Sequence, residues 1–385
     1  MNPLFADMPT TIFEAMSGAA RDLGAVNLGQ GFPDFGWPED VIARAADALV
    51  TGSNQYPPMR GLPELREAVA AHYRLHQDLV IDPAQVIVTS GATEALASSL
   101  LALIEPGDEV VLIQPLYDAY LPLVLRAGGV PRLVRLTPPD WRITEAVLAE
   151  AFTERTKLVV FNNPHNPTAR VFGADELALV AAAALRSEAL VLADEVWEHL
   201  FFDRPSFPSI AGLPGMAERV IKLGSAGKIF SMTGWKVGWI VAPRALAEPI
   251  AKAHQFVTFT TAPNLQAGAA YGLGKPLGYF EDMRAGFAGP RDAMRQKLDA
   301  AGYVTLDSEG TYFLCVDLAA SGIAMGDAEF CRRAVAEAGV AAIPLSAFYA
   351  ENPVTNVIRL CYAKKAETIE AGIAALARAR EMFAG

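Results

Sequence analysis

The chain has 385 residues, of which 52% are hydrophobic and 19% are charged, a composition typical of a globular protein. Its formal net charge of -11 argues against nonspecific binding to nucleic acid or to an anionic membrane. A chain of this length can bury a large core, and it predicts two or three domains or lobes.

Cysteine usage and apolar patterning indicate the compartment. The three cysteines are widely spaced in apolar segments, which predicts buried free thiols in a reducing environment: Cys315, Cys331 and Cys361. Residues 1–21 show no basic region followed by an apolar run, so we expect no signal peptide. The apolar runs are short and broken by charges, which argues against a transmembrane helix. We therefore expect a cytoplasmic protein with neither nucleic acid nor membrane as partner.

The first part of the chain is expected to be partly irregular, with a turn-rich segment at residues 29–36. An amphipathic helix is predicted after Gly61, because apolar residues there follow helical spacing: Leu62, Leu65, Val69 and Tyr73. His72 and His76 lie one turn apart on this helix, but no further ligand set is apparent. We interpret both as helix-surface residues and expect no metal site.

From residue 86 onward, short apolar runs alternate with helical patterns, which predicts an α/β sheet covered by helices on both faces. The runs are residues 86–88, 110–113, 158–161, 190–192, 220–223 and 237–241. Beyond about residue 285 the pattern changes to a second, α+β lobe. Its expected elements are helices at 291–300 and 329–338, strands at 312–316 and 357–361, and an Ala-rich C-terminal helix.

A lysine follows the run 220–223, in the sequence Ser225-Ala226-Gly227-Lys228. The stretch fails the phosphate-loop motif, because Lys222 and Ile229 stand where Gly and Ser or Thr are required. Two interpretations remain. The lysine is either an amine held near a phosphorylated cofactor as a Schiff-base former, or a surface lysine in a Gly-rich loop.

Ligands of a doubly wound sheet lie in the crevice beyond the carboxyl ends of its strands. After the run 86–88, residues 90–93 open a helix whose backbone N–H groups suit a phosphate, although many such turns are Gly-rich for packing alone. After the run 190–192, Asp194 is compatible with two functions. It either caps a helix or keeps a pyridine nitrogen protonated.

Three more side chains extend this set. Asn166 follows the run 158–161 in an Asn-Pro-rich turn, where it either serves the turn alone or contacts a ligand ring. Tyr117 follows the run 110–113, where it either packs in the core or stacks on a ligand ring. Arg359 interrupts an apolar strand. Because arginine is rarely buried unless paired and its planar fork matches a carboxylate, we interpret Arg359 as functional.

Eight short motifs are spread along nearly the whole chain, at residues 26–35, 54–56, 91–96, 163–167, 194–196, 228–238, 309–313 and 358–361. In this order they resemble the class I/II aminotransferases, fold-type I enzymes that use pyridoxal 5′-phosphate (PLP). The branch they most resemble contains the kynurenine/glutamine transaminases and the methionine aminotransferases.

The resemblance implies a fold. It is the α/β fold of fold-type I PLP transferases, with a large doubly wound, mostly parallel seven-stranded sheet domain and a smaller α+β domain. We expect residues 1–45 to form an N-terminal segment that packs with the small domain. Residues 46–280 would form the large PLP-binding domain, and residues 281–385 the small C-terminal domain.

The resemblance also implies roles at the cofactor. Lys228 would form the Schiff base and move the proton at the substrate Cα, and Asp194 would pair with the pyridine nitrogen. Asn166 would contact the ring oxygen, and Tyr117 would stack on the ring. The residues expected around the phosphate are Gly91, Ala92, Thr93, Ser225 and Lys236.

Substrate and subunit contacts follow from the same resemblance. Arg359 would bind the substrate α-carboxylate. The residues expected to border the substrate are Gly31, Asn166 and Phe13. Tyr56 would reach the phosphate in the neighbouring subunit, so that the active unit is a homodimer.

Two positions depart from the family pattern. Trp197 stands where relatives often have a tyrosine that hydrogen-bonds the ring oxygen and lowers the pKa of the cofactor–lysine imine. Loss of such a bond costs roughly 1.5–3 kcal/mol, or about one to two pKa units, although the indole N–H is an alternative donor. Lys236 stands where many relatives carry arginine. The lysine keeps the positive charge but lacks the planar, forked guanidinium group.

The predicted reaction is ping-pong transamination between an amino acid and a 2-oxo acid. The sequence shows one carboxylate-binding arginine and no obvious second one. This favours an apolar, sulfur-containing or aromatic donor of the methionine, glutamine, kynurenine or aromatic type. The alternatives on the same scaffold are an N-succinyldiaminopimelate-type aminotransferase and a cysteine-S-conjugate β-lyase. A non-catalytic PLP-binding regulator is a remote alternative.

Overall fold

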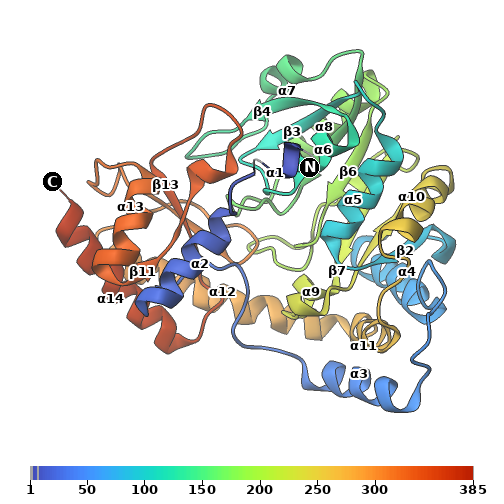
Figure 1. The fold of residues 1–385 in the computed structure, drawn as a ribbon, viewed down its shortest axis with the longest axis horizontal. Helices are drawn as coiled ribbons and strands as arrows, with labels where there is room; N and C mark the ends of the chain where they lie inside the picture. The colour runs from blue at the N-terminus through green and yellow to red at the C-terminus, as the bar shows by residue number, and fades with distance from the viewer. Residues whose placement is uncertain (1–2, 7, 385) are drawn as a thin grey trace.

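The structure, a computed structural model, describes residues 3–6 and 8–384; positions 1, 2, 7 and 385 of the expected terminal regions lie outside this range. Its centre is a seven-stranded sheet of order β2-β8-β7-β6-β5-β3-β4 within the described chain (Figure 1). The strands are β2 (Val86–Thr89), β3 (Glu109–Gln114), β4 (Val130–Arg135), β5 (Thr156–Asn162), β6 (Leu190–Asp194), β7 (Val220–Ser225) and β8 (Gly238–Val241). Only β8 runs antiparallel to its neighbours, so the predicted mostly parallel sheet is confirmed.

Side-chain alternation along the strands gives this sheet two buried faces. Val110 and Leu112 of β3 belong to the apolar cluster on one face, whereas Val111 and Ile113 belong to the cluster on the other. The first face is covered by α5 (Ala92–Leu103), α6 (Tyr120–Ala127) and α10 (Arg244–Val257), and the second by α7 (Glu145–Ala151) and α8 (Ala174–Arg186). Helices therefore cover both faces, as the alternation predicted.

A second, antiparallel sheet of order β12-β13-β10-β9 forms the C-terminal part. Its strands are β9 (Val304–Thr305), β10 (Phe313–Asp317), β12 (Ile343–Pro344) and β13 (Val357–Cys361). The helical elements around it are α12 (Leu277–Ala300), α13 (Asp327–Arg333), the π-turn η4 (Ala334–Ala338) and α14 (Ala366–Phe383). The expected α+β lobe is present, but α12 is much longer than the predicted helix at 291–300.

The N-terminal residues are more regular than expected. After α1 (Pro3–Ala6), residues 12–23 form α2 (Ile12–Leu23), which Thr11 caps at its start by accepting from the Glu14 N–H. Gly24 ends the helix in the left-handed conformation that glycine adopts without strain. β1 (Val26–Asn27) then pairs in parallel with β11 (Val340–Ala341), and α2 lies beside the C-terminal helices in Figure 1.

The chain next crosses to the large sheet. α3 (Glu39–Thr51) packs on α11 (Pro263–Leu273), and α4 (Pro63–Gln77) confirms the helix predicted after Gly61. The remaining short turns are η1 (Pro83–Gln85), η2 (Ile210–Gly212), α9 (Ala226–Ile229), η3 (Thr233–Trp235) and η5 (Leu345–Phe348). The division at residues 45 and 280 stays a prediction, and α12 runs through the second of these boundaries.

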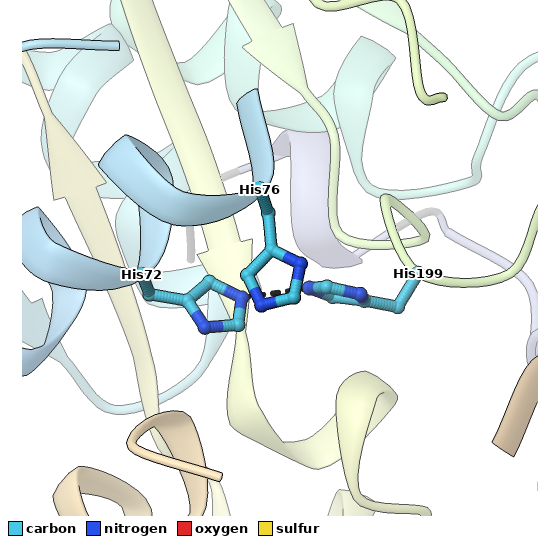
Figure 2. A group of neighbouring side chains, drawn as sticks. All are labelled: His72, His76 and His199. Atoms are coloured by element: carbon cyan, nitrogen blue, oxygen red, sulfur yellow. Dashed lines mark hydrogen bonds between the residues drawn. The ribbon is translucent and has the colours of Figure 1, made fainter. Parts of the chain in front are cut away.

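Two sequence-based interpretations have clear outcomes here. All three cysteines are buried free thiols, as predicted. The interpretation of His72 and His76 as surface residues is wrong: His72 is 2% exposed and His76 is half-buried, and both meet His199 (Figure 2). The reason is that Phe280 of α12 and the loop after β6 cover this side of α4.

Among the described residues, the structure contains no helix with both the length and the apolarity needed to cross a bilayer.

Candidate active site

The predicted site residues gather because several strands end at one edge of the large sheet. β6 and β7 are parallel neighbours in which Asp194 pairs with Leu223, so Asp194 and Ser225 both lie at the carboxyl end of the sheet. β8 is antiparallel and therefore begins at this same edge, where Gly238 pairs with both Thr89 and Ser225. Its reversed direction brings Lys236, just before the strand, to the site.

Lys228 lies in the short helix α9, directly after β7. The Ser225 hydroxyl caps this turn by accepting from the Lys228 backbone N–H at 3.3 Å. The lysine Nζ lies 3.4 Å from the Tyr312 hydroxyl and 4.4 Å from the centre of the Trp197 ring. Burial lowers the pKa of Lys228 to about 8, although the nearby Asp194 carboxylate opposes the shift. A large share of this amine is therefore neutral near pH 8.

Asp194 is 5% exposed, and burial raises the pKa of its carboxyl. The Tyr120 hydroxyl donates to Asp194 Oδ2 at 2.6 Å and works against that shift, as does the positive charge of Lys228. The Asn162 side-chain amide donates to the Asp194 carbonyl oxygen at 2.8 Å. The carboxylate is thus held in one orientation at the strand end.

The start of α5 offers the backbone donors that a phosphate requires. Gly91 is its N-cap with φ 80°, and no side chain caps the helix. The first-turn N–H groups of an α-helix lack intrahelical partners, and here they belong to Ala92 and Thr93. A Cβ built on Gly91 would lie 3.2 Å from Lys236 Cε and 3.3 Å from its Nζ, so the ammonium stands directly beside this helix start. This donor set fits the phosphate of PLP.

Arg359 crosses from the antiparallel sheet into the same region. It is 1% exposed; its Nη1 donates to Asn166 Oδ1 at 2.8 Å and its Nη2 to the Gly29 carbonyl at 3.1 Å. Burial lowers the pKa of Arg359 to about 10, which leaves it charged at neutral pH. Its Nε has no hydrogen-bond partner among the described residues. A buried orphan donor on a guanidinium matches an incoming carboxylate.

The remaining predicted residues surround this arginine or lie further out. Phe13 packs 5.2 Å from the Arg359 guanidinium, and the Gly31 carbonyl accepts from the Tyr312 hydroxyl at 2.6 Å. Tyr117 packs edge-on against Tyr120, with ring centres 5.6 Å apart. Tyr56, by contrast, is 82% exposed on the outer surface, where its ring contacts Phe259.

Sequence reasoning missed two tyrosines of the site. Tyr120 belongs to the first turn of α6, and only its long reach back to Asp194 gives it a role. Tyr312 was included in a family motif without a role, yet its hydroxyl lies between Lys228 and the Gly31 carbonyl. A hydroxyl-bearing ring next to a predicted strand is a weak signal, so neither tyrosine could be assigned from pattern alone.

Comparisons with known proteins identify the family to which the chain belongs. The family described as aminotransferase class I and II matches residues 24–376. The chain is 40% identical over 376 residues to a probable N-succinyldiaminopimelate aminotransferase DapC of Mycobacterium tuberculosis, covering 94% of each chain. It is 39% identical over 374 residues to the methionine aminotransferase of Escherichia coli, covering 97% of this chain and 96% of the relative. Kynurenine–oxoglutarate transaminase 1 of mouse is 36% identical over 387 residues, and the alignment covers 91% of each chain.

Solved structures give the same result. The crystal structure of YbdL from Escherichia coli, described with a methionine aminotransferase function, superposes with a TM-score of 0.94 at 38% identity, covering 98% of this chain and 99% of the other. That of N-succinyldiaminopimelate aminotransferase from Mycobacterium tuberculosis reaches 0.95 at 40% identity, covering 98% and 100%.

Fold and site together define a PLP-dependent transferase of amino-acid metabolism. More closely, the chain belongs to the class I and II aminotransferases, in the branch that contains the methionine aminotransferases, the kynurenine transaminases and the DapC-type enzymes.

Replacing Trp197 tests the departure from the family pattern. In the PLP-loaded Trp197→Tyr variant, we expect the pH-dependent change of cofactor absorbance to move about one to two units lower. The new phenol would supply a charge-assisted hydrogen bond worth roughly 1.5–3 kcal/mol to the ring oxygen. Spectrophotometric titration checks this, with Trp197→Phe as the control that adds no donor. Superimposable wild-type and Tyr titrations would refute the prediction.

Removing the Tyr120 hydroxyl should change the pH–rate profile. The hydroxyl stabilises the Asp194 carboxylate, so Tyr120→Phe should raise the pKa of Asp194 further. A group that must stay ionised loses function as the pH falls through its pKa. The acid limb of kcat/KM should therefore move about one to two units higher. Tyr303→Phe is the matched control, because its hydroxyl donates only to the Leu376 carbonyl in the small lobe. Equal profiles for wild type and Tyr120→Phe would contradict this role.

Proposed function

We propose that this aminotransferase moves the α-amino group of an apolar, sulfur-containing or aromatic L-amino acid to a 2-oxo acid by a ping-pong mechanism. The observation that carries the proposal is the enclosure of Arg359 by aromatic rings. Its guanidinium carbon lies 3.9 Å from the centre of the Phe313 ring, 5.1 Å from that of Phe348 and 5.2 Å from that of Phe13. One buried cation among aromatic walls suits a substrate with a single α-carboxylate and a weakly polar side chain.

The residues support this chemistry as follows. Arg359 binds the α-carboxylate and, through Asn166, is oriented toward the end of β5. When bound, PLP would supply an aldehyde for the substrate amine and a protonated ring as electron acceptor. Lys228 moves the proton at the substrate Cα; its pKa of about 8 suits a general base near neutral pH. Asp194 would keep the ring nitrogen protonated, and the start of α5 with Lys236 and Ser225 would hold the phosphate.

An N-succinyldiaminopimelate-type activity is the second candidate. The relative of that name is 40% identical, against 39% for the methionine aminotransferase, so sequence similarity does not separate the two. The two candidates differ in the charge of the donor side chain. A donor with an additional carboxylate requires a further cation, whereas an apolar or aromatic donor is complementary to the rings around Arg359.

A panel of donors and acceptors tests the proposal directly. We expect methionine, aromatic amino acids, glutamine or kynurenine to show kcat/KM values at least about tenfold above those of N-succinyldiaminopimelate, measured with several 2-oxo acids. Lys228→Ala should lose nearly all turnover in both directions. A preference for the succinylated donor would overturn the proposed substrate class. Release of pyruvate and ammonia from a cysteine conjugate without any acceptor would identify the β-lyase alternative. Turnover of Lys228→Ala at a rate near that of wild type would exclude Lys228 as the catalytic lysine.

We also propose that the active unit is a homodimer in which Tyr56 reaches the partner's phosphate. The support is an exposed aromatic face. Tyr56 is 82% exposed, Phe256 87%, and Phe259, whose ring contacts that of Tyr56, 38%. Large apolar side chains gathered in this way on a monomer indicate a surface that a partner covers.

Mixed dimers test this arrangement. Tyr56→Ala and Lys228→Ala dimers should each be nearly inactive at limiting PLP. If Tyr56 acts across the interface, a mixed dimer contains one site with both residues intact. Random exchange should then restore about a quarter of the wild-type activity, because half of the dimers are mixed and each has one such site. Mixing Lys228→Ala with itself is the control, and no recovery in the mixed sample would contradict the proposal.

A further inference from the structure

Three of the five histidines converge outside the proposed PLP site. His72 and His76 lie one turn apart on α4, and His199 belongs to the loop after β6 (Figure 2). Their candidate ligand atoms all lie within 4.8 Å of one another. The Nε2 atoms of His72 and His199 are 2.7 Å apart and share a hydrogen bond. Two elements 127 positions apart in sequence thus bring three imidazoles to one point.

Hydrogen bonding determines where the lone pairs of this cluster are. His72 Nδ1 lies 3.1 Å from the Leu273 carbonyl oxygen, which can only accept, so Nδ1 carries the proton. The Nε2 lone pair of His72 therefore points into the cluster and accepts from His199 Nε2. A histidine whose Nδ1–H is held by a carbonyl is the arrangement that proteins use to orient a metal ligand.

Two further nitrogens of the cluster lack partners. His76 Nε2 is a buried candidate ligand atom without a hydrogen-bond partner among the described residues, and His199 Nδ1, likewise buried and unpartnered, is free to take up a proton. Buried polar atoms are rarely left unpaired in folded proteins, because each costs about 1–3 kcal/mol. Burial also lowers the pKa of His72 and of His76 to about 4. Burial disfavours the charged form of all three rings, and the neutral imidazole is the form that binds metals.

We propose that His72, His76 and His199 bind one divalent transition-metal ion, with Zn²⁺ as the expected species. Imidazole nitrogens suit Zn²⁺, Ni²⁺ and Cu²⁺, and three of them leave room for water in the coordination sphere. Zn–N distances of about 2.0–2.1 Å and tetrahedral angles require nitrogens about 3.3 Å apart. Small side-chain rotations separate the 2.7 Å pair and draw His76 inward. The proton shared by the two Nε2 atoms then moves to His199 Nδ1.

The surroundings are compatible with an added cation. Lys222 and Arg284 are the positive groups that act on the cluster. The charge of Lys222 is compensated by the carboxylates of Glu195 and Glu198, which contact its amine. Phe280 packs its ring 4.6–5.1 Å from all three imidazoles and covers one side of the cluster. A bound ion would therefore clamp α4 to the loop after β6.

Metal binding to the tag-free holoenzyme tests this proposal. After chelator treatment and dialysis, ZnCl₂ is titrated by calorimetry, and CoCl₂ is followed by its visible d–d absorption, which PLP does not share. We expect one ion per chain and a higher Tm with Zn²⁺. His76→Phe keeps the ring packing but removes the nitrogens. It should weaken Zn²⁺ binding by more than the roughly 10–100-fold typical of losing a second-shell partner, and it should abolish the shift in Tm.

Two further variants keep the test decisive if a substitution perturbs the fold. His76→Cys restores a zinc ligand at the same place and should recover most of the affinity that His76→Phe loses. His254→Gln removes a histidine that hydrogen-bonds with Glu94 and Met59, neither of which belongs to the cluster. This variant should bind Zn²⁺ like wild type. Equal affinity in wild type and His76→Phe, or no stoichiometric binding by wild type at tens of micromolar Zn²⁺, would overturn the proposal.

Discussion

The attraction between the Lys228 amine and the Asp194 carboxylate is the interaction on which the site depends. Burial favours the neutral form of each group, whereas each charge stabilises the other. The two charges lie close enough to influence each other because β6 and β7 are parallel neighbours that end at the same edge. A slip of one residue in this pairing would turn every side chain of a strand to the opposite face. The register of two buried strands therefore determines the electrostatics of the site.

The sequence predicted these groups because their positions follow from topology. In a mostly parallel sheet, every residue just after an apolar run lies at one edge, so Asp194, Asn166 and Lys228 could be grouped before any contact was known. The direction of β8 was not predictable in this way. An apolar run looks the same whichever way it enters the sheet, and Lys236 was assigned through the family resemblance alone.

What the sequence did not predict depends on contacts between distant segments. His72 follows the spacing of an amphipathic helix, but whether it faces solvent or core depends on what covers α4. Here Phe280 and His199 cover it, from segments far along the chain. Tyr120 likewise reaches Asp194 across 74 positions. Periodicity describes one element at a time, so such convergences lie beyond it.

The loop after β6 connects the two polar centres of the large domain. Asp194 and Trp197 face Lys228, whereas Glu195 and Glu198 face the buried Lys222. Burial opposes the charge on Lys222, but the two carboxylates outweigh it and raise its pKa. Breaking a buried ion pair on one side costs about 3–5 kcal/mol, because a charge is left uncompensated.

The loop therefore has little freedom to move, which explains how Trp197 keeps its place beside the amine. His199 follows directly in the same loop. Any ligand that binds His199 acts on a segment whose other end holds the Asp194 carboxylate. The loop after β6, held by both the ion network and the apolar core, is thus the physical link between the histidine cluster and the proposed site of chemistry.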